Sequence, residues 1–348
     1  MTGGVRTSVL VVSDTHLAHP FPYGIPSDLP HIDLLIHAGD LTMLGTIPEF
    51  HQALDMLATI PADVKLVIPG NHDLALDPEW IHRTPEMLLR WERRSGVPGW
   101  AGRVGREYWE MTQGVWFGEQ SRAVREGVTM LTEGMHEIVL KNGATAKVYA
   151  SPYQPEFCDW AFAYNRNEDR FNVPRESLVD ASNIAERPMS DGQHAHPDKR
   201  NIDFVITHGP PYGRLDLTAH GAKVGCPHLL AAISNLKPRV CCFGHIHEGW
   251  GVERIAWDDD HSAAPQVAHS TIESFKSAWD VRDGPPLIEK MVIGSATKTK
   301  APGPVVVDLS DDSTSASVPG RSTTLVNAAI MDVSYKPSNL PILLYINL

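Results

Sequence analysis

Short apolar runs recur along the chain, and each of them ends in polar residues. Their length and their β-branched side chains are typical of buried strands, and stretches with helical periodicity lie between several of them. The strand-like runs are Ser8–Val12, Leu34–Ile36, Val64–Ile68, Phe204–Ile206 and Val240–Phe243, and the helical stretches are Ile47–Ile60, Pro78–Trp91 and Cys226–Leu236. Strands that alternate with helices predict an α/β protein with buried, partly parallel sheets.

Two regions depart from this alternation. Gly96–Gly127 is rich in Gly, Trp and Arg, so we expect a long irregular excursion there. Asp258–Arg321 begins with three consecutive aspartates, which we interpret as a solvated charge run rather than a metal cluster. Its Ser/Thr-rich end, Ser310–Ser322, predicts disorder or a flexible flap. A last strand-like run, Ile342–Ile346, then closes the chain.

Composition and charge narrow the class of partner. The chain has 348 residues, of which 42% are hydrophobic and 21% charged, as in ordinary globular proteins. Its net charge of -12 argues against a protein that follows a nucleic-acid backbone, because such proteins usually carry a basic face. We therefore expect no nucleic-acid polymer as partner, whereas a small phosphorylated substrate is compatible with this charge. The sequence does not indicate a protein partner.

Cysteine usage suggests a reducing compartment. The four cysteines are too few for a disulfide framework: Cys241 and Cys242 are adjacent in an apolar run, and Cys158 and Cys226 stand alone. No apolar segment has the length of a membrane span, and the start of the chain does not have the pattern of a signal peptide. We expect a soluble cytoplasmic protein with no membrane partner.

Five polar segments follow or end the strand-like runs, and they carry the candidate chemistry. They are Ser13-Asp14-Thr15-His16, His37-Ala38-Gly39-Asp40, Gly70-Asn71-His72-Asp73, Thr207-His208-Gly209 and Gly244-His245-Ile246-His247. Ligand sites of α/β sheets gather at the carboxyl ends of strands, so these segments are expected to converge. Asp-x-His and His-x-His place two side chains on the same side of an extended segment. Gly39, Gly70 and Gly244 precede ligand residues, as tight turns near a site require.

The donor types point to a pair of metal ions. Carboxylate, imidazole and carboxamide together suit Mn, Fe or Zn, and the absence of thiolate from these segments disfavours a purely structural zinc site. Any one of these segments is weak evidence for a metal site, because turn capping by polar residues explains one or two of them. Five such segments in this order, each following a hydrophobic run, are a specific signal for a metal site.

The order D-x-H, G-D, G-N-H-D, H-G and G-H-x-H resembles that of the calcineurin-like metallophosphoesterases, and it spans residues 14 to 247. This resemblance implies a four-layer α/β/β/α sandwich with two mixed β-sheets packed face to face. The alternation of strands and helices agrees with that fold but does not by itself distinguish it from a three-layer one.

A closer resemblance, to the metallophosphoesterase-domain-containing (MPPED) subgroup, covers more of the chain. It rests on Ala150–Tyr153, His208–Pro211, Val224–Cys226, His247–Gly251, Val326–Ala328 and Tyr335–Asn339. The subgroup pattern passes directly from about Ile255 to about Thr324, so we predict a single domain over residues 1–348 with an insertion at about 256–323. Some animal members carry Gly at the position of His245, whereas this chain keeps the histidine and with it the full ligand set.

The family resemblance also implies roles for the ligand residues. Asp14, His16 and His247 are expected to hold one metal, Asn71, His208 and His245 the second, and Asp40 to bridge them. The cofactor is then two divalent metal ions, with Mn expected and Fe, Zn or Mg as alternatives. A hydroxide shared by ions about 3.5–4 Å apart would attack phosphorus in line.

Four further residues are candidates for catalysis or substrate binding. His72 is the candidate general acid, because an imidazole beside ligand Asn71 could reach the leaving oxygen without binding metal. Asp73 is placed with His72 in the catalytic set, with a role in tuning or anchoring the loop. Asn71, His72, Arg214 and Tyr153 are the expected substrate contacts, Arg214 being the nearest candidate for a phosphate clamp.

Other polar and aromatic residues receive structural interpretations. His194 and His196 form a second His-x-His, but Ser190–Arg200 has no preceding apolar strand and is expected to be a solvated loop. For Tyr153, Phe157, Trp160 and Phe162, core packing outweighs stacking on a substrate base, although Tyr153 stays a candidate. The remaining histidines are assigned surface, cap or packing roles: His19, His31, His37, His51, His82, His136, His220, His228, His261 and His269.

Several functions fit this pattern. The leading hypothesis is a dinuclear metal-dependent phosphodiesterase of small esters such as cyclic nucleotides, because that is the activity the subgroup resemblance implies. A phosphomonoesterase or protein phosphatase is the alternative within the enzyme class. A catalytically weak nucleotide-binding regulatory protein is an alternative from another class, and a DNA nuclease ranks behind it because of the acidic charge.

Overall fold

The first strand, β1 (Arg6–Val12), is buried on both of its faces. Val9 and Val11 belong to one apolar cluster, and Leu10 and Val12 belong to another. Because side chains alternate along a strand, β1 lies in a sheet with a packed layer on either side. The computed structural model describes residues 4–96, 98–99, 106–172, 202–257, 303–310 and 320–348, and in this part of the chain two six-stranded sheets share that arrangement.

The first sheet has the order β12-β14-β1-β2-β3-β4. Strands β1 to β4 run parallel, whereas β14 runs antiparallel to β1 and parallel to the edge strand β12. On its outer face, α1 contributes the buried side chains of Phe50, Ala53, Leu54 and Leu57 to a cluster that also contains Leu10 and Val12. The strand bounds are β2 (Ile32–His37), β3 (Ala62–Val67), β4 (Val128–Met130), β12 (Val305–Asp308) and β14 (Ile342–Asn347), and α1 spans Ile47–Thr59.

The second sheet has the order β11-β13-β10-β9-β6-β5. Its four central strands run parallel, and the edge strands β11 and β5 run antiparallel to their neighbours. Helix α6 (Pro227–Leu236) covers its outer face, where Leu229 and Ile233 pack with Cys241 and Phe243. The strand bounds are β5 (Gly134–Val139), β6 (Thr145–Ser151), β9 (Phe204–Thr207), β10 (Val240–Phe243), β11 (Gly251–Ala256) and β13 (Ser322–Asn327).

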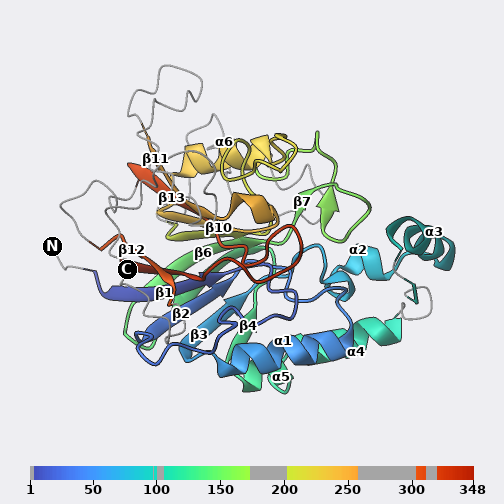
Figure 1. The fold of residues 1–348 in the computed structure, drawn as a ribbon, viewed down its shortest axis with the longest axis horizontal. Coiled ribbons are helices and arrows are strands. Elements are labelled where there is room, and N and C mark those ends of the chain that lie inside the picture. Colours follow the sequence, from blue (N-terminus) through green and yellow to red (C-terminus); the bar gives the residue numbers. More distant parts are fainter. Residues whose placement is uncertain (1–3, 97, 100–105, 173–201, 258–302, 311–319) are drawn as a thin grey trace, which may run out of the picture.

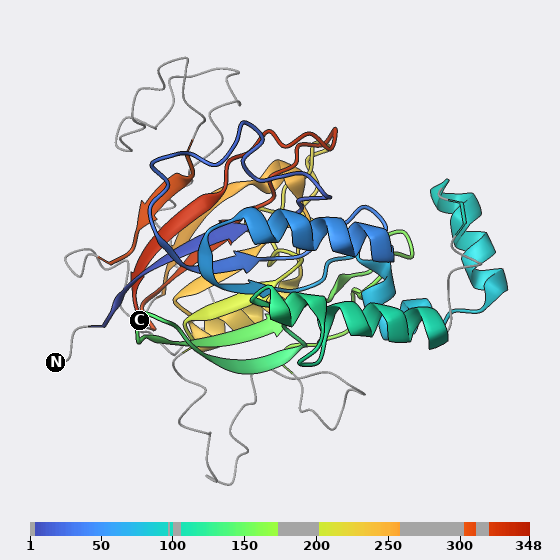
Figure 2. The same ribbon diagram turned by 90° about the horizontal axis from the view of Figure 1, so that it is seen from below.

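The two sheets pack face to face. Their inner faces form one apolar cluster, to which β1 gives Val9 and Val11 and β10 gives Val240 and Cys242. Figure 1 shows the layers edge-on, with α6 above one sheet and α1 and α4 below the other. Figure 2 views the molecule from the side of α1 and α4 and shows how these helices lie along the first sheet. The predicted four-layer α/β/β/α sandwich with two mixed sheets is therefore confirmed.

The five predicted strands and the last strand-like run are strands in the structure, but the prediction of one helical stretch and the prediction of one irregular region were wrong. Pro78–Trp91 is two helices, α2 (Pro78–Ile81) and α3 (Pro85–Ser95). A proline disfavours helical backbone in the residue before it, and Thr84 instead caps α3. Gly96–Gly127 contains α4 (Arg106–Trp116) and α5 (Arg122–Arg125), so the irregular excursion is helical in its described part.

Smaller elements complete the described chain. They are β7 (Gln154–Pro155), β8 (Ala163–Tyr164), and the 3-10 turns η1 (Leu74–Leu76) and η4 (His247–Gly249). Among the described helices, none combines the length and the apolarity needed to cross a bilayer.

The predicted insertion at about 256–323 joins two neighbouring strands. Ala256, at the end of β11, pairs with Ser322, at the start of β13, so the two flanks of the segment lie side by side. Within it, β12 adds an edge strand to the first sheet. The described residues exclude most of Asp258–Arg321, most of Ser310–Ser322 and all of Ser190–Arg200. The predicted charge run, flap and polar loop therefore stay predictions.

Candidate metal centre

The seven predicted ligands lie at the carboxyl ends of five strands, in both sheets. Asp14 and His16 follow β1, Asp40 follows β2 and Asn71 follows β3, all in the first sheet. The other three, His208, His245 and His247, follow β9 and β10 in the second sheet. Because the two sheets pack face to face with these ends together, ligands of both meet at their seam.

Four of the ligand residues have left-handed backbone. The φ angles are 52° at Asp14, 42° at His16, 54° at Asp40 and 65° at His245. Such values are uncommon for residues other than glycine, and they concentrate at functional sites, where surrounding structure holds them. The period-two argument for Asp-x-His was therefore wrong: β1 ends at Val12, and a turn rather than an extended segment aims Asp14 and His16.

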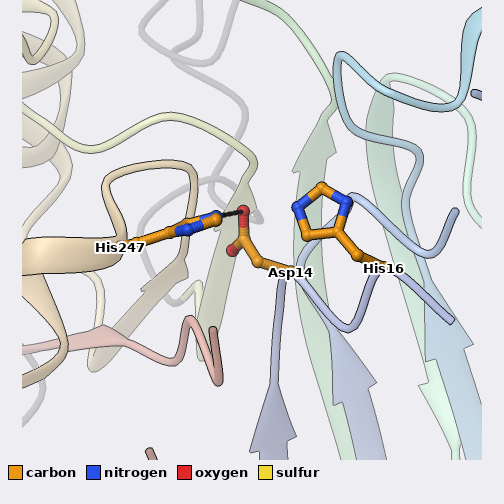
Figure 3. Close-up of side chains that lie close together, drawn as sticks. All are labelled: Asp14, His16 and His247. Carbon is orange, nitrogen blue, oxygen red and sulfur yellow. Dashed lines mark ion pairs between the residues drawn. The ribbon is translucent and has the colours of Figure 1, made fainter. Parts of the chain in front are cut away.

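The ligand atoms form three overlapping groups, within each of which they lie within 4.8 Å of one another. The groups are Asp14 with His16 and His247, His16 with Asp40 and His72, and Asp40 with His208 and His245. Figure 3 shows the first of them, with the Asp14 carboxylate between the imidazoles of His16 and His247. The structure thus brings six of the seven predicted ligands together.

Asp40 occupies the position expected of a bridging ligand. Its Oδ2 lies 3.6 Å from Nε2 of His16 and 3.4 Å from Nε2 of His208, so one carboxylate oxygen faces both groups. Its Oδ1 accepts a hydrogen bond from the backbone N–H of His72 at 2.8 Å. Asn71, the seventh ligand, places its Oδ1 3.0 Å from Nε2 of His208. All seven candidates therefore belong to one continuous cluster.

Backbone carbonyls orient the imidazoles. The Nδ1 atoms of His16, His208 and His247 lie 2.9, 2.9 and 3.0 Å from the carbonyl oxygens of Thr42, Ala38 and Asp332 respectively. A histidine that donates from Nδ1 to a carbonyl presents Nε2 as its ligand atom, and this is the usual arrangement around a protein-bound metal. In all three side chains Nε2 faces a carboxylate of the cluster.

These residues fit a pair of divalent cations. Nε2 of His16 is buried and has no hydrogen-bond partner among the described residues, which leaves its lone pair for an ion. Nitrogen and oxygen ligands at about 2.0–2.2 Å from one ion lie about 3.0–3.4 Å from each other. His208 to Asp40 and His247 to Asp14, both at 3.4 Å, match this spacing.

A family model described as calcineurin-like phosphoesterase matches residues 7–249, which run from β1 to η4 and contain every candidate ligand. The chain belongs to the calcineurin-like phosphoesterase family. The groups of ligand atoms at the seam of the sheets agree with this membership.

The chain is also similar to individual proteins. Metallophosphoesterase domain-containing protein 1 of Homo sapiens is 30% identical over 253 residues, which cover 71% of this chain and 62% of that protein. The chain thus matches less than two thirds of the relative's length. UPF0046 protein T07D4.2 of Caenorhabditis elegans is 26% identical over 65% of this chain and 48% of its own. A probable rhamnogalacturonate lyase C of Emericella nidulans is 29% identical over 78% of this chain but only 19% of its own.

The pKa values of the histidines in the ligand cluster shift in different directions. Burial opposes the charged form of His208, but the carboxylates of Asp40 and Asp14 outweigh burial and raise the pKa of His208 to about 9. In the same way Asp14 outweighs burial and raises the pKa of His247 to about 8. Burial instead lowers the pKa of His16 to about 4 and that of His245 to about 3. Two imidazoles therefore hold protons at neutral pH that ligation must displace.

Asp73 holds two loops of the site together. It is fully buried, its Oδ2 accepts from the N–H groups of Gly70 and Leu41 at 2.8 and 3.2 Å, and its Oδ1 accepts from the N–H and hydroxyl of Thr42 at 3.0 and 2.7 Å. Burial, together with the charge of Asp40, raises the pKa of Asp73 to about 7. Both oxygens nevertheless only accept, which favours the carboxylate form. These contacts give Asp73 the anchoring role and put it in no metal group.

His72, the candidate general acid, contacts two aromatic residues, Trp160 and Tyr335. Its Nδ1 lies 2.8 Å from the carbonyl oxygen of Met43, and its ring stacks on Trp160 with centroids 4.1 Å apart. Its Nε2 lies 3.5 Å from the hydroxyl of Tyr335. Trp160 was expected to pack in the core, and Tyr335 was noted only within a subgroup segment. Neither contact has a local sequence signal, because the partners lie 88 and 263 residues from His72.

The two remaining candidates lie in other networks. The guanidinium of Arg214 is buried and pairs with Glu253 on β11 at 2.5 Å. Tyr153 lies under the guanidinium of Arg170, 3.5 Å from the ring centroid, and packs edge-on against Phe162. These contacts of both side chains are therefore with residues other than the predicted metal ligands.

Proposed function

We propose that this protein is a metal-dependent phosphoesterase, and specifically a phosphodiesterase of small phosphate esters such as cyclic nucleotides, working with two divalent cations, of which manganese is expected. The observation that carries the proposal is the position of Asp40, whose carboxylate faces His16 and His208 while its other oxygen holds the loop of His72. Two cations in this cluster would supply activation of water and neutralisation of charge on the phosphoryl group.

The chain's own residues supply the proton. His72 lies beside the cluster, and because its Nδ1 lies 2.8 Å from the carbonyl oxygen of Met43, Nε2 is the nitrogen that can give a proton to the substrate. Its ring is fixed by Trp160, so it needs no reorganisation to protonate a leaving oxygen. General-acid catalysis of this kind typically contributes about 10²–10⁴ in rate.

A diester is favoured over a monoester by the charge around the centre. A monoester dianion is typically held by an arginine that binds two of its oxygens. The arginine that follows His208 in sequence, Arg214, is already paired with Glu253 in a buried ion pair. A diester carries one negative charge less on its phosphoryl group and needs no such clamp.

Composition supports the rest of the proposal. The net charge of -12 disfavours nucleic-acid polymers and suits a small substrate. All four cysteines are free thiols, which fits the reducing cytoplasm. Cell fractionation of the tagged full chain tests the location, and recovery in an oxidising compartment would contradict it.

A substrate panel tests the activity. Bis-p-nitrophenyl phosphate, p-nitrophenyl phosphate and cyclic nucleotides are offered to the manganese-loaded protein and to the Asp40→Asn variant. We expect the diesters to be hydrolysed at least about tenfold faster than the monoester, and the variant to lose both activities. Faster monoester hydrolysis would replace the proposal by a phosphomonoesterase or protein phosphatase. Two bound metals without hydrolysis of any ester would favour a nucleotide-binding regulatory protein.

A further inference from the structure

Tyr335 lies in a turn that is tied directly to a metal ligand. The turn lies between β13 and β14, and the carbonyl of Asp332 at its start lies 3.0 Å from Nδ1 of His247. The carboxylate of Asp332 accepts from the N–H groups of Ser334 and Lys336 at 2.7 and 3.1 Å. The turn is therefore braced from within and fixed to the cluster, so its tip has a defined place beside it.

Tyr335, at the tip of the turn, contacts three imidazole rings of the site. The ring centroid of Tyr335 lies 4.9 Å from that of His16, 5.3 Å from that of His247 and 6.1 Å from that of His72. Its φ is 56°, a left-handed conformation that is unfavourable for an aromatic residue and that it shares with four ligands. Yet the residue is 45% exposed, so the ring faces the solvent side of the site rather than a core.

The hydroxyl of Tyr335 and Nε2 of His72 are spaced to share an oxygen. Their separation of 3.5 Å is too long for a strong direct hydrogen bond. An oxygen atom placed about 2.8 Å from each would accept from both. The residues matched by the family model end at 249, so Tyr335 is not part of the pattern that defines the family.

We propose that Tyr335 is a catalytic residue whose hydroxyl donates a hydrogen bond to the leaving-group oxygen that His72 protonates. This inference rests on the proposed phosphoesterase activity. As the P–O bond breaks, its electron pair stays on the oxygen, which takes the proton from Nε2 of His72. Tyr335 keeps its own proton, and its hydrogen bond stabilises the charge that develops on the oxygen. His72 keeps its Nδ1 proton on the Met43 carbonyl.

Substitution of one atom tests the contact. A leaving group that carries much negative charge in the transition state, such as the ribose oxygen of a cyclic nucleotide, needs the hydroxyl more than p-nitrophenoxide does. In Tyr335→Phe we expect kcat to fall about tenfold or more with the cyclic nucleotide and by less than about threefold with bis-p-nitrophenyl phosphate. Metal content should stay at two ions per chain.

The matched control is Tyr345→Phe. Tyr345 pairs with Ser8 in the register of β1 and β14, at the end of the sheet opposite the ligands, and its ring contacts Arg6. This variant should behave as wild type with both substrates. Equal losses with the two leaving groups in Tyr335→Phe, no loss at all, or loss of metal would each overturn the inference.

A binding measurement keeps the inference separate from the activity. Methyl phosphate contains an ester oxygen, and its affinity for the metal-loaded protein is measured by calorimetry. We expect Tyr335→Phe to raise its Kd about fivefold or more, with Tyr345→Phe unchanged. If wild type hydrolyses no ester, the proposed activity fails, whereas the Kd ratio still decides the contact of Tyr335. An unchanged Kd in Tyr335→Phe would contradict that contact.

Discussion

The carboxylate of Asp40, which follows a strand of the first sheet, lies 3.4 Å from Nε2 of His208, which follows a strand of the second sheet. The ligand cluster therefore exists only while the two sheets pack face to face. Apolar packing of the inner faces, from Val9 to Val326, holds the carboxylates and imidazoles in place against the cost of their burial.

Asp40→Asn tests the bridging position. An amide of nearly the same shape offers one oxygen and no negative charge, so it cannot neutralise two cations that share it. We expect loss of at least one ion per chain and a fall in kcat of about 100-fold or more. Metal analysis after gel filtration and the diester assay measure the two effects. Asp55→Asn, whose side chain is 70% exposed, is the control and should leave both unchanged.

His72→Gln separates proton donation from metal binding. Turnover should fall about 10²–10⁴-fold because the general acid is lost, while two ions stay bound. A ring nitrogen of His72 lies within 4.8 Å of ligand atoms of His16 and Asp40, so a role as metal ligand is the alternative. Loss of an ion from this variant would establish that alternative instead.

Metal binding should release protons in a pH-dependent way. At pH 7 His208 and His247, whose pKa values are raised to about 9 and about 8, both hold protons that ligation displaces. Calorimetry in buffers of different ionisation enthalpy should count about one proton fewer at pH 8.5 than at pH 7. A count that is flat over this range would contradict the pairing of these imidazoles with Asp40 and Asp14.

The same two histidines make the stability of the metal-free protein depend on pH. Their folded pKa values lie above the ordinary value of 6.5, so the stability they contribute is full below pH 6.5 and is lost as pH rises through 8 to 9. Urea unfolding of metal-stripped protein should therefore show a falling midpoint over this interval. Saturation with metal should reduce the fall, because the ligating imidazoles are then neutral in the folded state.

Gly244→Ala tests the close approach of β10 to Asp14. A Cβ at this position would overlap Oδ2 of Asp14 and Oγ of Ser13. We expect the carboxylate to shift, with loss of the metal held by Asp14, His16 and His247. Gly114→Ala is the control: its Cβ meets no atom within 4 Å in helix α4, and the change should stabilise the protein by about 0.5–1 kcal/mol. Retention of both metals in Gly244→Ala would contradict the crowding.

Asp73→Asn tests the anchor of the two loops. The amide nitrogen would face two of the four donors that the carboxylate now accepts from Gly70, Leu41 and Thr42. We expect destabilisation by about 2–4 kcal/mol and weaker metal binding by about 10–100-fold. Urea unfolding and metal titration measure these effects. Asp308→Asn, at an exposed ion pair with Arg6, should change stability by less than about 1 kcal/mol, and an equal loss in both variants would argue against the anchor.

Local sequence was enough for the framework. Runs such as Ser8–Val12 and Val240–Phe243 predicted strands because burial on both faces needs continuous apolar residues, and each run is a strand in the structure. The ligand residues were recognisable because each follows such a run within a few residues. Helices were harder: Pro85 splits Pro78–Trp91, and α4 contains a glycine that obscured its periodicity.

The sequence by itself determined six of the strands and the polar residues that follow them, since both depend on neighbours along the chain. Only the tertiary structure decided that Trp160 and Tyr335 contact His72 and that Arg214 forms an ion pair with Glu253. These pairs are 39 to 263 residues apart. Their contacts depend on how two sheets pack and on left-handed turns at the strand ends, and no local propensity encodes either.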